Sequence, residues 1–258
     1  MGTFLFDDII FGPVQSRRLG VSLGINLLPI DSKLCTFDCI YCECGWNPEK
    51  LAGAGHLPTA EKVKAQLELK LQNMAEEGVL PDVITFAGNG EPTLHPEFEQ
   101  VIDDTISLRN QYAPKARIAV LSNSTMVHKE KVVRALKKVD DNILKLDSGF
   151  EETIRIMNCP QSNFSLKKLI HNLKKFEGKL IIQTMFLIGD FKGHHIDNTT
   201  PEEVDAWLSL IKEISPSQVM VYSIDRDTPA SGLIKVENDV LEAIAEKVTA
   251  LGIQTSVA

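Results

Sequence analysis

The sequence has few of the features that mark secreted, membrane-spanning or nucleic-acid-binding proteins. Its start, Met1 to Asp8, is short and acidic and lacks the basic segment that opens a signal peptide. No apolar run approaches the roughly 18 residues that span a membrane. No long basic run occurs, and the formal net charge is −8. We therefore expect a cytoplasmic protein with no membrane partner. The acidic balance weighs against RNA as a partner, although a local basic patch would still permit it.

Cysteine is also scarce, and its distribution is uneven. Of the five cysteines, Cys35, Cys39 and Cys42 stand in a Cys-x3-Cys-x2-Cys spacing, with Cys44 close behind. An odd number with one dense cluster argues against a disulfide framework and for reduced thiols that bind a metal. Thiolates suit zinc, copper or iron–sulfur clusters. Three ligands leave a four-coordinate centre with one position open to a substrate.

A zinc clip is the alternative interpretation of the same cysteines. If Cys44 supplied a fourth thiolate, the metal would tie the fold together and offer no open position. The Cys-x-Cys pair formed by Cys42 and Cys44 is a tight fit for one tetrahedral ion, which favours the open centre with three cysteines. The competing class of function is therefore a non-enzymatic metal-binding or electron-carrier module.

Strand patterns alternate with helix patterns along the chain, which predicts an α/β fold with parallel strands. Thr59 and Thr200 are expected to cap the helices after the first and fifth strands, and residues 253–257 suit a final short strand. We interpret residues 1–258 as one domain, with an N-terminal extension at 1–20 and a C-terminal helix and short strand within 225–258. The six predicted strands lie at 21–28, 83–87, 118–121, 143–146, 180–188 and 219–224.

Polar side chains follow several of these strands, where parallel α/β folds place their chemistry. The first strand leads into the cysteines. The second is followed by Gly88-Asn89-Gly90-Glu91, in which glycines let the backbone approach a ligand and the glutamate offers a carboxylate. The remaining candidates, which follow the third, fourth and sixth strands, are Ser122, Asn123, Asp147, Tyr222 and Ile224.

Several other residues have a plain structural interpretation beside a functional one. A buried structural thiol is expected at Cys159, and an exposed loop at His194 and His195. The polar pair Gln183 and Thr184 interrupts an apolar strand, and we expect both to face the interior of the sheet. Arg17 and Arg18 suit an anion clamp or an ordinary surface pair.

The cysteine spacing, with the aromatic Tyr41 just before the last cysteine, resembles the cluster loop of the radical S-adenosylmethionine (SAM) enzymes. Residues 88–91 resemble the Gly-Gly-Glu motif of that family, with Asn89 in place of the first paired glycine. The resemblance implies a six-unit (βα) partial barrel of parallel strands. It also implies that the three clustered cysteines hold a [4Fe–4S] cluster, whose fourth iron binds SAM.

The same resemblance implies where SAM lies. Residues 88–91 would meet its amino group, the residues after the third and fourth strands its carboxylate or ribose, and the end of the sixth strand its adenine. The cofactor-binding residues implied in this way are Tyr41, Gly88, Asn89, Gly90, Glu91, Ser122, Asn123, Asp147, Tyr222 and Ile224.

The activity implied is reductive cleavage of SAM to a 5′-deoxyadenosyl radical, which abstracts hydrogen from an unidentified substrate. A flavodoxin- or ferredoxin-type protein would supply the electron. The motifs Cys-Ile-Tyr-Cys, Gly-Glu-Pro-Thr-Leu-His-Pro and Tyr-Ser-Ile-Asp-Arg look most like the subgroup related to wyosine tRNA-base synthases. The chain is similar in size to glycyl-radical-enzyme activases. A tRNA base, a backbone glycine of a partner enzyme, and a small molecule or peptide are the competing substrates.

Overall fold

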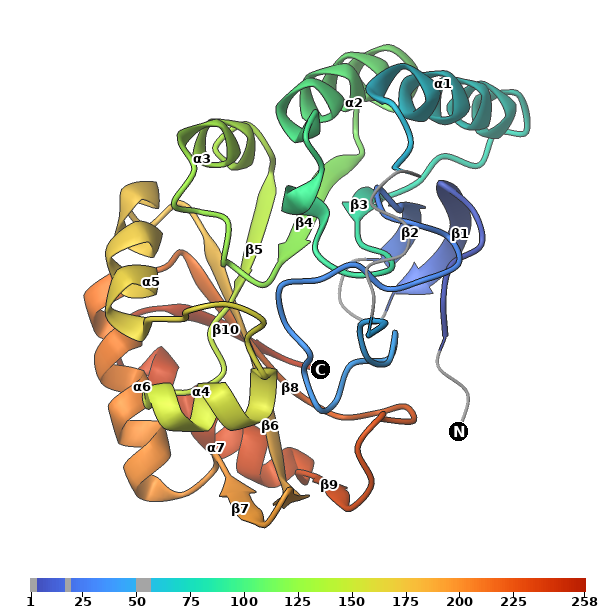
Figure 1. Ribbon diagram of the computed structural model, residues 1–258. Helices are drawn as coiled ribbons and strands as arrows, with labels where there is room; N and C mark the ends of the chain where they lie inside the picture. Colours follow the sequence, from blue (N-terminus) through green and yellow to red (C-terminus); the bar gives the residue numbers. More distant parts are fainter. Residues whose placement is uncertain (1–3, 17–19, 50–56) are drawn as a thin grey trace.

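A computed structural model describes residues 4–16, 20–49 and 57–258, and its centre is one open sheet (Figure 1). The strand order is β1-β2-β3-β4-β5-β6-β8-β10, and each neighbouring pair from β2 to β10 is parallel. The sheet therefore has the parallel, non-closed form predicted for a partial barrel. These strands are β2 Gly20–Ile25, β3 Val83–Phe86, β4 Arg117–Ser122, β5 Asp141–Lys145, β6 Ile181–Phe191, β8 Gln218–Ser223 and β10 Gln254–Val257.

Helices follow the strands and form an arc around the outside of the sheet (Figure 1). The predicted caps are present, because the Thr59 side chain accepts from the Lys62 amide and the Thr200 side chain from the Glu203 amide. Within the described residues, no helix is long and apolar enough to cross a membrane. The helices are α1 Ala60–Glu76, α2 Phe98–Tyr112, α3 Glu130–Leu136, α4 Glu151–Asn158, α5 Leu166–Leu173, α6 Pro201–Ile214 and α7 Asn238–Thr249, with short 3₁₀ turns η1 Pro92–Leu94 and η2 Lys174–Phe176.

The two faces of the sheet bury different side chains because residues alternate along each strand. On the outer face, residues such as Ile182, Phe186 and Val221 pack with the helices in the main hydrophobic core. On the inner face, five strands each contribute one residue to a small apolar layer near their amino ends. This layer consists of Val83, Ala119, Ile143, Ile181 and Met220.

Alternation also corrects one sequence-based expectation. Thr184 lies on the outer face and donates to the Leu146 carbonyl at 2.8 Å, so it does not point into the barrel. Gln183 is its neighbour on the strand and faces the interior. Two adjacent residues of a regular strand cannot share a face, and the two polar residues therefore separate.

A small antiparallel extension rises beyond the carboxyl edge of the sheet. There β6 continues to Phe191 and pairs with β7 His194–Asp197 and with β9 Leu233–Lys235. His194 and His195 are exposed as expected, but they belong to strand β7 rather than to a loop. The extension forms a wall beside the end of the barrel.

Two further elements differ from the sequence-based expectation. Residues in the N-terminal extension, where no strand was predicted, form β1 Ile10–Ser16, which is antiparallel to β2 with a register shift between Phe11 and Val14. Glycine and proline within this strand concealed the pattern. Helix α4 was also missed, because eight residues with Ile154 and Met157 as its main buried apolar positions give a weak periodic signal. Arg17 and Arg18 lie outside the described residues.

Candidate metal and cofactor site

The cysteines lie on a loop, here called the cysteine loop (residues 33–47), that leaves β2 at the carboxyl edge of the sheet. Its first part is fastened to the turn after β3: the Leu34 amide donates to the Asn89 carbonyl at 2.8 Å, and the Glu91 amide to the Leu34 carbonyl at 3.0 Å. Leu34 and Gly90 form an isolated β-bridge. Two segments more than fifty residues apart in the sequence are thus held together.

The middle of the cysteine loop rests on α4 and on the segment after β8. The Ile40 amide donates to the Met157 carbonyl at 2.9 Å, and the Asp38 amide to the Asn158 carbonyl at 2.9 Å. From the other side, the Ala230 amide donates to the Ile40 carbonyl at 3.2 Å. Helix α4, which the sequence analysis missed, is therefore a main support of the loop.

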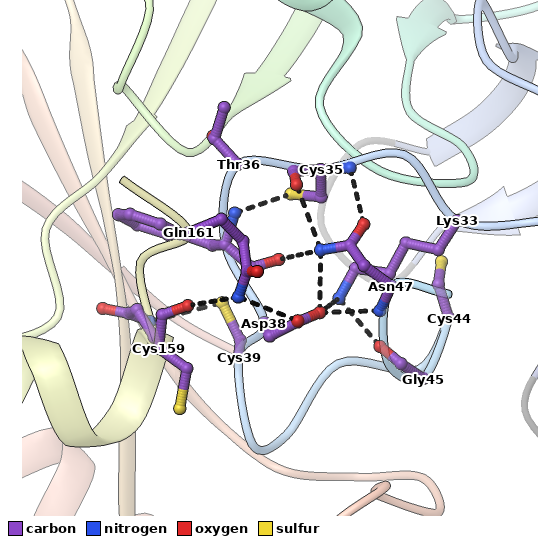
Figure 2. A network of polar contacts seen from close by, with 12 residues as sticks. Lys33, Cys35, Thr36, Asp38, Cys39, Cys44, Gly45, Asn47, Cys159 and Gln161 are labelled. Atoms are coloured by element: carbon purple, nitrogen blue, oxygen red, sulfur yellow. Dashed lines mark hydrogen bonds and ion pairs between the residues drawn. The ribbon is translucent and has the colours of Figure 1, made fainter. Parts of the chain in front are cut away.

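Polar side chains curl the loop on itself, as Figure 2 shows. The Asn47 amide group bonds both the amide and the carbonyl of Cys35, at 2.9 and 3.0 Å. The Asp38 carboxylate accepts from the backbone amide of Asn47 at 2.7 Å and from the Gln161 side chain at 2.9 Å. These bonds bring the two ends of the loop together, which is the curl that three nearby thiols need to face one centre.

Nitrogen–hydrogen groups from outside the clustered cysteines point at the sulfurs of Cys35 and Cys39. The Asn123 side chain donates to Cys35 Sγ at 3.4 Å, and the Phe37 amide donates to the same sulfur at 3.5 Å. The Asn158 side chain donates to Cys39 Sγ at 3.4 Å. Such donors stabilise negative charge on sulfur and are a known means of tuning iron–sulfur centres.

The pKa values of the thiols differ because their surroundings differ. Burial raises the pKa of Cys39 to about 11 and also raises that of Cys35. A hydrogen bond from Cys44 lowers the pKa of Cys42, and the same bond raises the pKa of Cys44. Cys44 also lies within 3.4 Å of the Gly88 carbonyl oxygen, to which its thiol donates. The loop thus favours a thiolate first at Cys42, with Cys44 as its proton-bearing neighbour.

A buried lysine, Lys33, lies within the same loop. Its side chain is 1% exposed, and Nζ donates to the Gly45 carbonyl at 2.7 Å and forms an ion pair with Asp38 at 3.3 Å. Burial opposes the charge of Lys33, but the negative charges of Cys42 and Cys35, among others, raise its pKa overall. Sequence reasoning gave Lys33 no role, although it opens the cysteine stretch.

A second polar network lies against Cys39, at the ends of β5 and β8. Tyr41 Oη donates to Asp147 Oδ2, and Asn158 Nδ2 donates to the same oxygen at 2.7 Å. Lys145 Nζ donates to the hydroxyls of Tyr41 at 3.0 Å and Tyr222 at 3.5 Å, and lies 3.5 Å from Asp147. Three predicted site residues meet here, together with the unpredicted Asn158.

The charges in this network compensate one another. Burial raises the pKa of Tyr41, and the neighbouring Asp147 raises it further, so the hydroxyl keeps its proton. Burial opposes the charge of Lys145, but Asp147 raises its pKa overall. The Asp147 side chain is 0% exposed and also accepts from the Met185 amide at 3.0 Å. A buried ion pair with these additional hydrogen bonds is the form in which charges are tolerated inside proteins.

Glu91 ties the turn after β3 to the end of β4. Its carboxyl group accepts from Ser122 Oγ at 2.9 Å, from the Asn123 amide at 2.6 Å and from the Thr93 amide and hydroxyl. Burial raises its pKa against the effect of these donors. Four donors occupy the acceptor positions of one carboxyl group. Within this structure Glu91 therefore positions Asn123, whose side chain reaches Cys35.

The other residues of the predicted glycine motif are also brought to the cysteine loop. The Asn89 side chain is fully buried and donates to the Phe6 and Pro29 carbonyls at 2.8 Å each, so its amide fastens the N-terminal segment. Gly88 and Gly90 both have positive φ, at 157° and 135°. A Cβ atom at Gly90 would overlap the Leu34 carbonyl, which explains the glycine there.

The remaining sequence candidates lie at the edge of this region or outside it. Ile224 packs, partly buried, against the apolar cluster of the cysteine loop, as does Tyr222. His194 and His195 line a separate cavity of about 690 Å³ beside α4 and α6. Cys159 ends α4 in a left-handed conformation and donates its thiol to the Ile156 carbonyl at 3.3 Å.

The donor set fits an iron–sulfur cluster better than a single ion. In the described part of the chain, no three His, Cys, Asp or Glu side chains are grouped so that they could hold one metal ion. A four-iron cluster makes a different demand, because each thiolate binds its own iron atom. The curled loop, the donors aimed at sulfur and the buried cation are compatible with such a cluster. The zinc clip, which needs four sulfurs around one ion, receives no such support.

Comparison with known proteins adds a family. The family model described as the Radical SAM superfamily matches residues 30–200. The chain is 27% identical over 223 residues to a protein named GTPase Obg from Brachyspira hyodysenteriae, covering 85% of this chain and 30% of that protein. It is 32% identical to a UPF0026 protein from Methanocaldococcus jannaschii, covering 81% and 61%. It is 31% identical to a UPF0026 protein from Synechocystis sp., covering 85% and 77%. The chain thus spans less than two thirds of the first two relatives.

Solved structures resemble the fold at low sequence identity. A radical SAM methyltransferase from Sphaerobacter thermophilus aligns with a TM-score of 0.68 at 14% identity, over 92% of this chain and 65% of that chain. SuiB from Streptococcus suis, solved with its precursor peptide SuiA, aligns with a TM-score of 0.64 at 14% identity, over 91% and 48%. At these identities the likeness extends to the fold alone.

Proposed function

Because the chain belongs to the radical SAM superfamily, whose members are enzymes, we propose that it holds a [4Fe–4S] cluster and SAM at the cysteine loop and begins radical chemistry on a substrate. The observation that carries the proposal is the environment of the sulfurs. Asn123, Asn158 and the Phe37 amide donate to Cys35 and Cys39, and a buried cation lies within the same loop. These contacts suit thiolates rather than structural thiols.

The residues divide the work between holding and positioning. Cys35, Cys39 and Cys42 would ligate the cluster and leave one iron for SAM. When bound, the reduced cluster supplies the electron for cleavage of SAM, and hydrogen abstraction from the substrate follows. The loop and its apolar neighbours keep Cys39 and Tyr41 at 7% exposure each, which limits the access of water to the reacting groups.

The polar groups at the strand ends are proposed to orient SAM. The backbone around Gly88 and Gly90 lies beside the cysteine loop, and Asn123 lies against Cys35, so both suit contacts with the amino acid part of SAM. Asn158 links Asp147 to Cys39, and Lys145 links Asp147 to Tyr222, so Asp147 and Tyr222 suit the ribose and adenine. Glu91 and Asn89 act in this proposal by fixing the backbone that surrounds them.

We propose a substrate other than RNA for this site. Carboxylates pair with two of the basic side chains on and just after α3: Arg134 with Glu99 at 2.8 Å and Lys138 with Asp103 at 2.7 Å. Wyosine-type tRNA modification therefore has less support from the surface than activation of a partner protein or conversion of a small molecule or peptide. Strong, salt-sensitive binding of tRNA would contradict this choice.

Anaerobic reconstitution tests the proposed chemistry. The protein is loaded with iron and sulfide, reduced with dithionite, and assayed for 5′-deoxyadenosine after addition of SAM. We expect the product in the wild-type protein and its loss in Cys35→Ala. Cys159→Ala is the matched control, because that thiol bonds only a backbone carbonyl within its own helix, and it should retain product formation. A flavodoxin- or ferredoxin-type donor is expected to replace dithionite.

Two outcomes would overturn the proposal. A verified four-iron cluster that neither binds nor cleaves SAM would favour an electron carrier. Full SAM cleavage in Cys35→Ala would remove that residue from the cluster. Reconstitution with zinc in preference to iron would favour the metal-binding module.

A further inference from the structure

The buried lysine of the cysteine loop has a feature that loop architecture alone does not require. Lys33 Nζ needs only a hydrogen bond to hold the Gly45 carbonyl at 2.7 Å, and a neutral donor would serve. A full positive charge at 1% side-chain exposure is costly in free energy unless negative charge lies nearby. The structure provides one such charge at Asp38, and a cluster held by the three cysteines of the same loop would add more.

One carboxylate, that of Asp38, also faces Lys33. Asp38 lies 3.3 Å from Nζ, which is longer than a tight charge-assisted bond. The carboxylate is shared, because Asp38 also accepts from Asn47 and Gln161. Asp38 is therefore held in place by several donors and does not bind Lys33 alone.

The loop that Lys33 closes also carries the three clustered cysteines. Lys33 stands two residues before Cys35 and holds the carbonyl three residues after Cys42, so its side chain spans the curl that the three thiols share. Three thiolates around an iron–sulfur core give a net negative charge, which increases by one unit on reduction. In a buried site such charge interacts strongly with a nearby cation because little water screens it.

We propose that Lys33 is the buried counter-ion of the cluster and raises its reduction potential. This inference rests on the proposed cluster, and it assigns to Lys33, which does not ligate iron, a role in tuning the reduction potential. The physical reason is that a fixed positive charge stabilises the reduced state, which carries more negative charge, more than it stabilises the oxidised state. The neighbouring Asp38 acts in the opposite sense.

The test compares midpoint potentials in reconstituted proteins that carry equal amounts of cluster. Lys33→Met removes the charge and keeps much of the side-chain length, and its potential should shift to more negative values. Asp38→Asn removes the opposing charge and should shift the potential to more positive values. Lys174→Met is the matched control: Lys174 pairs with Glu213 at 2.9 Å on the surface, and its loss should leave the potential unchanged.

Opposite shifts in the Lys33 and Asp38 variants support the inference, because simple loosening of the loop would move both potentials in the same direction. Equal potentials in wild type, Lys33→Met and Asp38→Asn would overturn it and leave Lys33 as a loop fastener. If Lys33→Met fails to retain a cluster, the sign of the Asp38→Asn shift decides. A wild-type protein that assembles no reducible four-iron cluster would instead contradict the proposed function itself.

Discussion

Adding one methyl group at Gly90 should push the cysteine loop away from the turn after β3. Its φ is 135°, which side chains rarely adopt, and a Cβ atom there would overlap the backbone of Leu34. Leu34 begins the cysteine loop and exchanges hydrogen bonds with Asn89 and Glu91. The atoms that a new Cβ would overlap belong to the main chain of Leu34, so no rotation of a side chain can remove the overlap.

The cost of Gly90→Ala follows from two effects. Backbone strain contributes roughly 1–3 kcal/mol. Overpacking against a fixed neighbour contributes about the same again. Together they predict a loss of about 2–6 kcal/mol, which is a large share of the ~5–15 kcal/mol that stabilises a typical protein. Relief of the overlap would move Leu34, and with it the nearby Cys35, so cluster retention should fall as well.

Gly78→Ala provides the matched control. Gly78 also has positive φ, at 72°, but no atom lies within 4 Å of the position of a new Cβ. The change should cost only about 1 kcal/mol, from the left-handed backbone alone. Urea unfolding of both variants measures the free energies, and iron content per chain after reconstitution measures the effect on the loop.

The comparison has a clear refuting result. If Gly90→Ala and Gly78→Ala have the same unfolding midpoint and the same iron content as each other, the close approach of Gly90 to Leu34 is not what holds the loop. A stability loss in Gly90→Ala with full iron content would separate the two claims and refute the coupling to the cysteines.

Three further predictions test the network and the titrating groups. Asp147→Asn leaves Lys145 without its buried counter-charge and should lower the free energy of unfolding by roughly 3–5 kcal/mol. Asp190→Asn, at an exposed contact with His195, should cost less than about 1 kcal/mol, and equal losses would contradict the argument. In the metal-free protein, Cys42 should be alkylated at lower pH than the other two clustered thiols because its pKa is lowered, and mass spectrometry of peptides after timed alkylation measures the order. Burial raises the pKa of Glu91 in the folded protein. Its contribution to stability is therefore fully present below about pH 4.5 and is lost as the pH rises through the higher folded-state pKa. Urea titrations at several pH values should show that Glu91→Gln removes this dependence, and an unchanged pH profile would count against it.

The sequence by itself determined the parts of this protein that depend on local pattern. The period of apolar residues located the six main strands and most outer helices, and the threonine caps at 59 and 200 were correct. The spacing of Cys35, Cys39 and Cys42 predicts a metal centre with an open position, and this stays a prediction. The glycines after β3 indicated a close backbone approach, which Gly90 makes to Leu34.

Local pattern failed where an element was short or interrupted. Helix α4 has eight residues, and β1 contains glycine and proline, so neither carries a clear period. Both elements matter to the site: α4 supports the cysteine loop through Met157 and Asn158, and β1 extends the edge of the sheet beside β2. Their importance is visible only in the contacts that they make.

The tertiary structure alone decided which side chains meet the sulfurs. Asn123 and Asn158 stand 88 and 119 residues from the cysteines that they contact, and strand order and register bring them there. Only the folded structure shows that the Glu91 carboxyl group contacts the end of β4 and that the Asn89 side-chain amide contacts the N-terminal segment. Residue type and spacing fix which chemistry a chain can supply, whereas the direction of each side chain depends on packing between segments far apart in the sequence.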